Sequence, residues 1–365
     1  MDAALSRLID QVQTARAAGG ALDIRGGGTK AFYGEAPGDG QRGEPLDVRP
    51  LAGISSYEPS ELVVTVRAGT PLVELEAALA EKGQCLAFEP PRFADGGTVG
   101  GTVAAGLAGP ARAAVGGVRD FVLGATLLNG RGEVVSFGGQ VMKNVAGYDV
   151  ARLLAGSLGI LGVICEVSLK VLPQPPAVAT LRFELDEATA LKRINEWSSQ
   201  PLPINASAWW EGMLVVRLAG AAAAVQAAQQ RLGGERIDDA LAATFWAGLR
   251  DQRDEFFEGA ARAVERGAAL WRLSVPSTAA PLKLSGEQLI EWGGAQRWLC
   301  TSAPHAQLRE AAQQAGGHAT LFRGADKSCG VFAPLSPPLA RIHRELKASF
   351  DPDRVFNRGR LYREL

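Results

Sequence analysis

The amino-acid sequence predicts an α+β protein made of two regions that differ in character. In the first region, which is rich in glycine and valine, short strand-like stretches alternate with helix-like ones. Six of the seven tryptophans of the chain lie beyond residue 200, in the second region. The pattern of this region is typical of a β-α-β-β-α series. Such a series predicts an antiparallel sheet with helices on one face.

The border between the two regions is marked by prolines. The stretch 163–171 alternates apolar and polar residues, as a strand with one buried face does. Three prolines within residues 173–176 then end the alternation. We therefore expect a first domain over residues 1–175 and a smaller second domain over residues 176–338.

Cap and turn residues place the elements of the first region. Thr70 is the expected N-cap of a helix that has Pro71 in its first turn and Gly83 at its end. Asn129 and Gly130 form the turn of an expected hairpin. The expected strands are residues 22–25, 61–69, 85–91 and 163–171.

In the second region, strand patterns and helix patterns alternate less regularly. Its tryptophans are typical of a core, although aromatic residues are also enriched at partner surfaces. Arg217, Arg272, Arg297 and Arg323 lie on expected strands, where a guanidinium could pair with a ligand carboxylate. The expected strands are residues 180–185, 204–220 (a hairpin), 270–275, 297–302 and 318–324, and the expected helices are residues 186–200, 221–232 and 338–350.

Composition argues against several classes of function. The 365 residues carry a formal net charge of −1 and no Lys/Arg-rich block, so we expect no nucleic-acid partner. No stretch reaches the roughly 20 apolar residues of a membrane span, so we expect no transmembrane segment and a cytoplasmic protein. The three histidines lack metal-ligand spacing, so we expect no metal, although dispersed carboxylates leave that class open. The four separated cysteines are typical of free thiols.

The first of four glycine-rich segments follows a strand pattern. It reads Arg25, Gly26, Gly27, Gly28, Thr29 and Lys30. Successive glycines can adopt positive φ and turn several backbone N–H groups toward one point, which makes a concavity that binds phosphate oxygens. On its own, however, the segment is more typical of an ordinary structural turn.

The second segment lies between Pro90 and Gly109. Its glycines allow a close approach of backbone to ligand, and Thr98 adds a hydroxyl group. A helix expected to begin at Thr102 would direct its N-terminus at the same anion. The candidate binding residues here are Pro90, Gly96, Gly97, Thr98, Val99, Gly100, Gly101 and Gly106.

The remaining two segments complete the pattern. In the third, Gly116 and Gly117 precede the candidate residues Arg119 and Asp120. The candidates of the fourth are Lys143, Gly147, Tyr148, Asp149, Ser157, Gly159, Gly162, Val163 and Ile164. Each segment alone reads as a loop, whereas the four in this order form a much more specific signature.

Together, the four segments resemble the FAD-binding domain of the vanillyl-alcohol oxidase / p-cresol methylhydroxylase (PCMH-type) family. That resemblance implies a split FAD-binding domain of two α/β subdomains, plus a small α+β cap domain with an antiparallel sheet. It also implies that the first two segments hold the FAD diphosphate and that Gly159–Ile164 line its adenine and ribose. The final "FDPDRVFNRGRLY" is similar to the family's closing segment, with Arg358 in place of the usual proline. We therefore expect residues 339–365 to return to the FAD domain.

The resemblance also bears on how FAD is held. Many members of the family carry a histidine in the first turn that bonds covalently to the flavin. Thr29 occupies that position here, and no histidine occurs before residue 305. We therefore expect noncovalent FAD.

Within the family, "KNVAGYD" and the short second region resemble the smaller FAD-binding subunits of bacterial glycolate oxidases. This implies a complex with a larger FAD-linked subunit and an iron–sulfur subunit that oxidises glycolate to glyoxylate, and it leaves open a peripheral place at the inner membrane. The H-x-G-D-G-N-x-H motif of the larger 2-hydroxy-acid enzymes is missing, and no residue qualifies as the catalytic base. We expect an accessory or electron-relaying role. The alternatives are a self-sufficient enzyme similar to UDP-N-acetylenolpyruvoylglucosamine reductase and a noncatalytic scaffold subunit.

Overall fold

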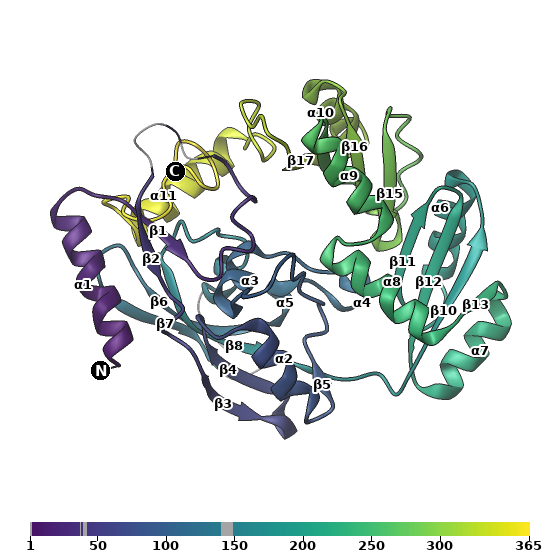
Figure 1. Cartoon of the computed structure of the whole chain (residues 1–365), viewed down its shortest axis with the longest axis horizontal. Coiled ribbons are helices and arrows are strands. Elements are labelled where there is room, and N and C mark those ends of the chain that lie inside the picture. Colours follow the sequence, from purple (N-terminus) through teal and green to yellow (C-terminus); the bar gives the residue numbers. More distant parts are fainter. Residues whose placement is uncertain (1, 37, 39–41, 140–148) are drawn as a thin grey trace.

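The computed structural model describes residues 2–36, 38, 42–139 and 149–365. Two sheet-containing regions lie side by side, the first at the lower left and the second at the right of Figure 1, and the C-terminal segment lies above the first. Helices and mostly antiparallel strands occur in both regions, which confirms the predicted α+β class.

The first region is built on a five-stranded antiparallel sheet with the order β3-β4-β8-β6-β7. Valines on β4 and β8 pair in register and pack beneath α2 and α3, as Val66 does opposite Val167. A parallel pair, β1 and β2, lies beside the sheet and packs with α1. The strands are β1 (Leu22–Arg25), β2 (Glu44–Asp47), β3 (Ile54–Glu58), β4 (Val63–Arg67), β6 (Val122–Leu128), β7 (Val134–Gly138) and β8 (Val163–Lys170).

Two predictions for this region are wrong. Helix α2 (Leu72–Ala80) has Pro71 as its N-cap, because the Thr70 hydroxyl instead donates a 2.7 Å hydrogen bond to the Arg67 carbonyl. The strand expected over residues 85–91 shrinks to β5 (Gln84–Cys85), which pairs with β9 (Leu172–Pro173). The other helices are α1 (Ala3–Ala17), α3 (Val99–Ala105), α4 (Arg112–Val115) and α5 (Val118–Phe121), with 3₁₀ turns η1 (Pro59–Glu61) and η2 (Ala151–Leu154).

The second region contains an eight-stranded antiparallel sheet with the order β13-β10-β12-β11-β15-β16-β14-β17. The predicted hairpin over residues 204–220 is confirmed as β11 and β12. Trp271 and Trp298 are buried in hydrophobic clusters of this region. The strands are β10 (Ala177–Glu184), β11 (Ile204–Trp210), β12 (Met213–Gly220), β13 (Glu235–Ile237), β14 (Ala269–Ser274), β15 (Glu287–Glu291), β16 (Gln296–Thr301) and β17 (His318–Arg323).

Helices cover both faces of this sheet, so the prediction of helices on one face is wrong. One face packs against α6, α7 and α10. The other packs against α8 and α9, whose Trp246 and Phe256 lie in one core with Trp298. The helices are α6 (Glu187–Ser198), α7 (Ala222–Leu232), α8 (Asp239–Asp251), α9 (Glu255–Glu265) and α10 (His305–Gln314), with the 3₁₀ turn η3 (Trp292–Gly294).

After the second region the chain crosses back to the first. Helix α11 (Pro337–Phe350) is followed by a stretch without helix or strand in which Phe356 forms an isolated parallel bridge with Leu22 of β1. Residues from opposite ends of the sequence therefore meet at β1.

Within the described part of the chain, no helix is both long and apolar enough to cross a bilayer.

Candidate cofactor-binding site

A cavity lies where the turn after β1, helix α3, the approach to β8 and the C-terminal segment meet. Sequence-predicted binding residues make up much of its wall, namely Arg25, Gly26, Gly27, Gly28, Thr29, Lys30, Thr98, Gly100, Gly101, Gly159, Gly162 and Ile164. Residues that sequence reasoning did not select complete the lining: Asp23, Ile24, Ala31, Val48, Ala68, Ala104, Ala105, Leu158, Asn357, Arg358 and Arg360.

The turn after β1 packs backbone against backbone on the second glycine segment. A Cβ atom on Gly27 would lie 1.6 Å from the Gly96 carbonyl oxygen, and one on Gly26 would lie 2.3 Å from Thr98 Oγ1. Gly28 has a φ of +71° and open space where its Cβ would be. The first two glycines are therefore required by the contact between the two segments, and the third by the left-handed backbone conformation.

Helix α3 begins at Val99 rather than at Thr102, so the predicted start is wrong by one turn. Thr98 is its N-cap and accepts a 3.2 Å hydrogen bond from the Gly101 amide. Gly100 packs on the first sheet, because a Cβ there would lie 2.6 Å from the Ala68 Cβ. Gly100 and Gly101, which were expected to precede the helix, lie in its first turn, and the missing side chain of Gly100 lets that turn pack against the end of β4.

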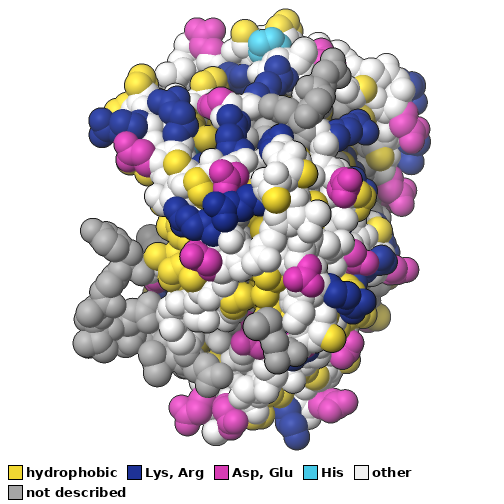
Figure 2. Space-filling model, turned by 90° about the vertical axis from the view of Figure 1, so that its left-hand side faces the viewer, with side chains coloured by type: hydrophobic (Ala, Val, Ile, Leu, Met, Phe, Trp, Pro, Cys, Tyr) yellow, Lys and Arg dark blue, Asp and Glu magenta, His cyan; other side chains and the backbone are white. Residues whose placement is uncertain are grey.

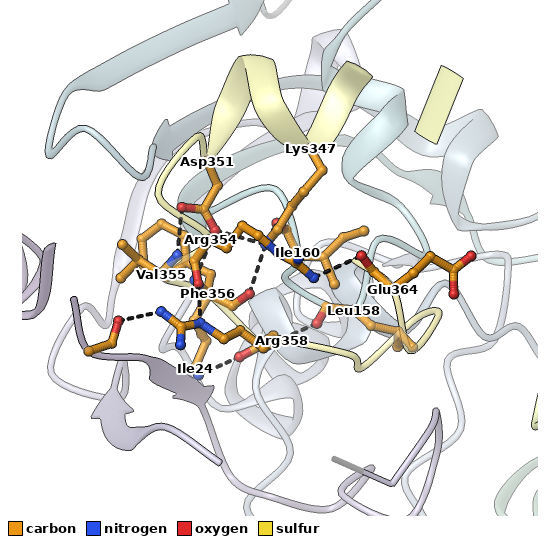
Figure 3. Close-up of polar contacts among 12 residues, drawn as sticks. Ile24, Leu158, Ile160, Lys347, Asp351, Arg354, Val355, Phe356, Arg358 and Glu364 are labelled. Atoms are coloured by element: carbon orange, nitrogen blue, oxygen red, sulfur yellow. Dashed lines mark hydrogen bonds and ion pairs between the residues drawn. The ribbon is translucent and has the colours of Figure 1, made fainter. Parts of the chain in front are cut away.

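Asn357 joins two walls of the cavity. Its Oδ1 accepts a 2.8 Å hydrogen bond from the Ile24 amide, and its Nδ2 donates a 2.6 Å hydrogen bond to the Leu158 carbonyl. Gly159, at φ +75°, lies directly beside it, because a Cβ on Gly159 would be 2.6 Å from Asn357 Nδ2. The C-terminal segment therefore sets the distance between the first turn and the approach to β8 (Figure 3).

Arg358 anchors the same segment on its outer side. Its guanidinium donates hydrogen bonds to the carbonyls of Gly19 and Gly20, just after α1. Arg360 reaches back to the first glycine turn and donates a 2.8 Å hydrogen bond to the Ala31 carbonyl. The replacement of the family's usual proline by Arg358 thus adds a contact with the end of α1.

Positive charge dominates the cavity. Arg25, Lys30, Arg358 and Arg360 line it, against the single carboxylate of Asp23. Burial lowers the pKa of Lys30 to about 8, and burial also lowers the pKa of Arg360. Most Lys and Arg side chains on the face shown in Figure 2 gather in its upper half, the level at which the C-terminal segment lies in Figure 1. An anion entering the cavity would relieve the desolvation of both cations.

These residues fit the diphosphate of a dinucleotide. The bare backbone at Gly28 leaves space for a ligand, and the partly buried cations Lys30 and Arg360 stand beside it. The charges of Asp251 and Glu76 act on Lys30 and that of Asp23 acts on Arg360, but of these three carboxylates only Asp23 lines the cavity. Diphosphate oxygens accept hydrogen bonds from both guanidinium groups and exposed main-chain amides. The small side chains of Ala68, Ala104 and Ala105 leave the inner wall free for an apolar or aromatic surface.

The other predicted binding residues lie outside this lining. Gly96 and Gly97 stand behind the first turn, Val99 and Val163 are buried, and Gly106 ends α3 at φ +65°. Pro90 is buried and Ser157 accepts a hydrogen bond from the Gly159 amide. Arg119 and Asp120 are exposed on α5, and Asp149 pairs with Arg152. Lys143, Gly147 and Tyr148 lie outside the described residues.

The four arginines on the second sheet have different surroundings. Arg217 pairs with Glu89 at 2.7 Å, across the border between the two regions. Arg297 is 0% exposed and faces α6, where it contacts Glu187, so it lies on the wrong side of the sheet for a ligand shared with the first region. Arg272 and Arg323 each have their guanidinium carbon 5.8 Å from the centre of the Phe322 ring, on the side that faces the first region. Over the described ranges, no three His, Cys, Asp or Glu residues are grouped so as to hold a metal ion.

Comparison with known proteins identifies the cofactor domain. Residues 5–138 match the family described as FAD binding domain. A crystal structure of alkyldihydroxyacetonephosphate synthase superposes with a TM-score of 0.63 at 16% sequence identity, covering 98% of this chain and 75% of that one. At this identity the likeness shows the fold alone.

Curated sequences extend the likeness beyond the FAD domain. Glycolate oxidase subunit GlcE of Escherichia coli is 48% identical over 358 residues, which cover 98% of this chain and 97% of that protein. Glycolate oxidase subunit GlcD of Bacillus subtilis is 32% identical over 43% of this chain and 33% of its own length. A D-lactate dehydrogenase of Anaerostipes hadrus is 29% identical over 62% and 48%. The chain uses FAD and belongs to the family of glycolate oxidase subunit GlcE, within the FAD-dependent hydroxy-acid oxidoreductases.

Proposed function

We propose that the chain is the smaller FAD-binding subunit of a glycolate oxidase complex that converts glycolate to glyoxylate, beside a larger FAD-linked subunit and an iron–sulfur subunit. The observation that carries this proposal is the 48% identity to GlcE over 98% of the chain. That likeness includes the whole second region, whereas the FAD-domain match ends at residue 138. The GlcD likeness, by contrast, covers 43% of this chain.

The role of this subunit in the complex is accessory or electron-relaying. This is supported by the missing H-x-G-D-G-N-x-H motif and by the lack of a metal-ligand group in the described part of the chain. When bound, FAD supplies the capacity to take two electrons from the hydroxyl-bearing carbon of a 2-hydroxy acid. The residues of this chain hold it: the amides of the first glycine turn and the cations Lys30 and Arg360 bind the diphosphate, and Asn357 keeps the walls in place.

Copurification and reduction by glycolate test the two parts of the proposal. The chain, purified at native abundance, is expected to bring down a larger flavoprotein and an iron–sulfur protein in fixed ratio. The isolated FAD-loaded chain is expected to keep its visible flavin absorption after anaerobic addition of glycolate, whereas the assembled complex bleaches. Rapid bleaching in the isolated chain would contradict the accessory role, and purification without either partner would contradict the complex. A chain without flavin absorption would instead indicate a scaffold.

A further inference from the structure

A strap, residues 324–336, leads from β17 of the second region to α11 and lies on the turn after β1 (Figure 1). None of its residues, all of which the structure describes, belongs to a helix or a strand. The Leu321 amide donates a 2.9 Å hydrogen bond to the carbonyl of Val331, which is fully buried. The centre of the Phe332 ring lies 5.6 Å from that of the Tyr33 ring. The strap therefore contacts both regions.

Lys327 of the strap holds the turn after β1 by two of its carbonyls. Lys327 Nζ donates a 2.6 Å hydrogen bond to the Phe32 carbonyl and a 2.7 Å hydrogen bond to the Gly34 carbonyl. These carbonyls follow closely on Lys30, which lines the cavity of the glycine turns. Hydrogen bonds from a charged donor are stronger than those between neutral groups. The two contacts therefore fix the backbone directly after the cavity wall.

Arg360 holds the neighbouring carbonyls of the same turn. Its Nη2 donates hydrogen bonds of 3.3 Å to the Lys30 carbonyl and 2.8 Å to the Ala31 carbonyl. Burial, and then the charge of Arg360, lower the pKa of Lys327, which agrees with two cations that lie near one another at a partly dry site. Together, the two cations hold the backbone from Lys30 to Gly34 through its carbonyl oxygens.

Glu35 makes a further contact between the turn and the strap. Its Oε1 accepts a hydrogen bond from the Val331 amide, and the residue is only 3% exposed. Its Oε2 lies 3.6 Å from Nε of Arg363, whose Nη2 donates a 2.5 Å hydrogen bond to the Lys327 carbonyl. A buried carboxylate is costly to leave without such partners. This cost favours a state in which the turn, the strap and the C-terminal segment stay together.

Arg309 ties the other side of the strap to the second region. It lies on α10, and its Nη2 donates hydrogen bonds of 2.6 Å to the Gly330 carbonyl and 3.3 Å to the Phe332 carbonyl. A continuous series of polar contacts thus runs from α10 through the strap to the turn that carries Lys30. A displacement of the second region would be transmitted along this series to the cavity.

We propose that Lys327 is a positioning residue for FAD, which holds the turn after β1 in its binding shape and thereby couples FAD binding to the docking of the second region. Lys327 is not among the described residues that line the cavity, so it acts through the carbonyls of Phe32 and Gly34. Coupling between two binding events is reciprocal. Bound FAD should therefore tighten the strap, and a loosened strap should weaken the binding of FAD.

Titration of the FAD-free chain with FAD, followed by flavin fluorescence, tests the first half of this coupling. Lys327→Met should raise the dissociation constant at least about tenfold, which corresponds to about 1.4 kcal/mol. Lys327→Arg keeps the positive charge and should restore most of the affinity. The matched control is Lys192→Met on α6, whose side chain is 77% exposed, and it should bind FAD as the unaltered chain does. An unchanged dissociation constant for Lys327→Met would overturn the proposal.

Amide hydrogen exchange with and without FAD tests the second half. In the unaltered chain, FAD should slow exchange in residues 327–332 of the strap as well as in residues 26–35. In Lys327→Met saturated with FAD, the slowing should persist in the glycine turn and be lost in the strap. A purely structural lysine would instead leave the effect of FAD on the strap unchanged. Strap exchange that ignores FAD in the unaltered chain would also overturn the proposal, and that result needs no variant to fold.

Discussion

Lys347 and Asp351 form a buried ion pair, with Lys347 Nζ 2.7 Å from Asp351 Oδ2 and side chains 4% and 0% exposed. The lysine also donates to the carbonyls of Ile160 and Phe356, and the aspartate accepts from the amides of Val355 and Phe356 (Figure 3). The pair thereby ties the end of α11 to the approach to β8 and fixes the segment that carries the cavity residue Asn357.

Removing one partner of this pair should therefore be costly. We expect Asp351→Ala to lower the free energy of unfolding by about 3–5 kcal/mol. The substitution removes the carboxylate that accepts hydrogen bonds from the buried ammonium group of Lys347 and from the amides of Val355 and Phe356. Urea unfolding followed by circular dichroism measures this. The control is Glu345→Ala on the same helix, which breaks the exposed pair with Arg341 and should cost less than about 0.5 kcal/mol. Equal effects of the two substitutions would contradict the structural role of the buried pair.

The contact between the first two glycine segments predicts a loss of cofactor. Gly27→Ala should reduce the FAD content of the purified chain severely, because the new methyl group would overlap the Gly96 carbonyl and push the turns apart. Gly259→Ala is the matched control, since its Cβ on α9 would meet nothing closer than 3.8 Å. That change should keep FAD and stabilise the chain by about 0.5–1 kcal/mol. The ratio of flavin to protein absorbance reports the outcome.

FAD should dissociate when the protein is denatured. Thr29 stands in the first turn, and no histidine is among the residues that line the cavity. Acid precipitation is therefore expected to leave the yellow flavin in the supernatant. Flavin that stays with the washed pellet would show a covalent bond and refute this expectation.

Glu291 should make stability depend on pH. Burial raises the pKa of Glu291 to about 7, against the opposing effect of hydrogen bonds from Trp298 and Gln296. The folded state therefore holds its proton more tightly than the unfolded state, so its contribution to stability is present below pH 4.5 and is lost as pH rises to about 7. Relative to the unaltered chain, Glu291→Gln should gain up to about 3 kcal/mol over that range.

The measurement is urea unfolding of both proteins at a series of pH values. Asp254, whose pKa burial raises to about 6, titrates in both proteins, so the difference between them isolates Glu291 in the first approximation. The charge of Asp254 contributes to the raised pKa of Glu291. A difference that does not vary with pH would contradict a raised pKa for Glu291.

Glu89 and Arg217 should be energetically coupled across the border between the regions. Glu89 Oε1 lies 2.7 Å from Arg217 Nη2, its Oε2 accepts from the Ala111 amide, and the pair is largely shielded from water. A double-mutant cycle with Glu89→Gln and Arg217→Met should give a coupling free energy of about 1 kcal/mol or more. The corresponding cycle on the exposed Arg236–Asp239 pair should give less than about 0.5 kcal/mol.

Much of the cavity could be predicted because its chemistry resides in consecutive backbone. Gly26, Gly27 and Gly28 favour a turn that can expose backbone amides, Thr98 lies in a second glycine-rich segment, and the segments taken together predict the site. By contrast, Asn357 gives no local sign of its function, because its two hydrogen bonds are made to residues far away in the sequence. The match of the closing segment to the family could have identified it.

The wrong predictions of the fold were made from local sequence patterns, whereas the observed contacts are set by tertiary packing. The Thr70 hydroxyl fits an N-cap by local rules, but it donates a hydrogen bond to the Arg67 carbonyl instead. Helices α8 and α9 cover a sheet face that was expected to lack helices, and Arg297 was selected although its strand turns it toward α6. Strand alternation gives the side chains of one face, whereas only the tertiary packing decides which face meets the first region.

The bond between Asn357 and the Ile24 amide joins residues 333 positions apart. During synthesis, the ribosome releases β1 and its glycine turn long before the residue that braces them has been translated. The nascent chain therefore has an incomplete FAD-binding site while the entire second region is being synthesised. Loading with flavin should be a late event in biogenesis, and the apoprotein should depend most on chaperones during that interval.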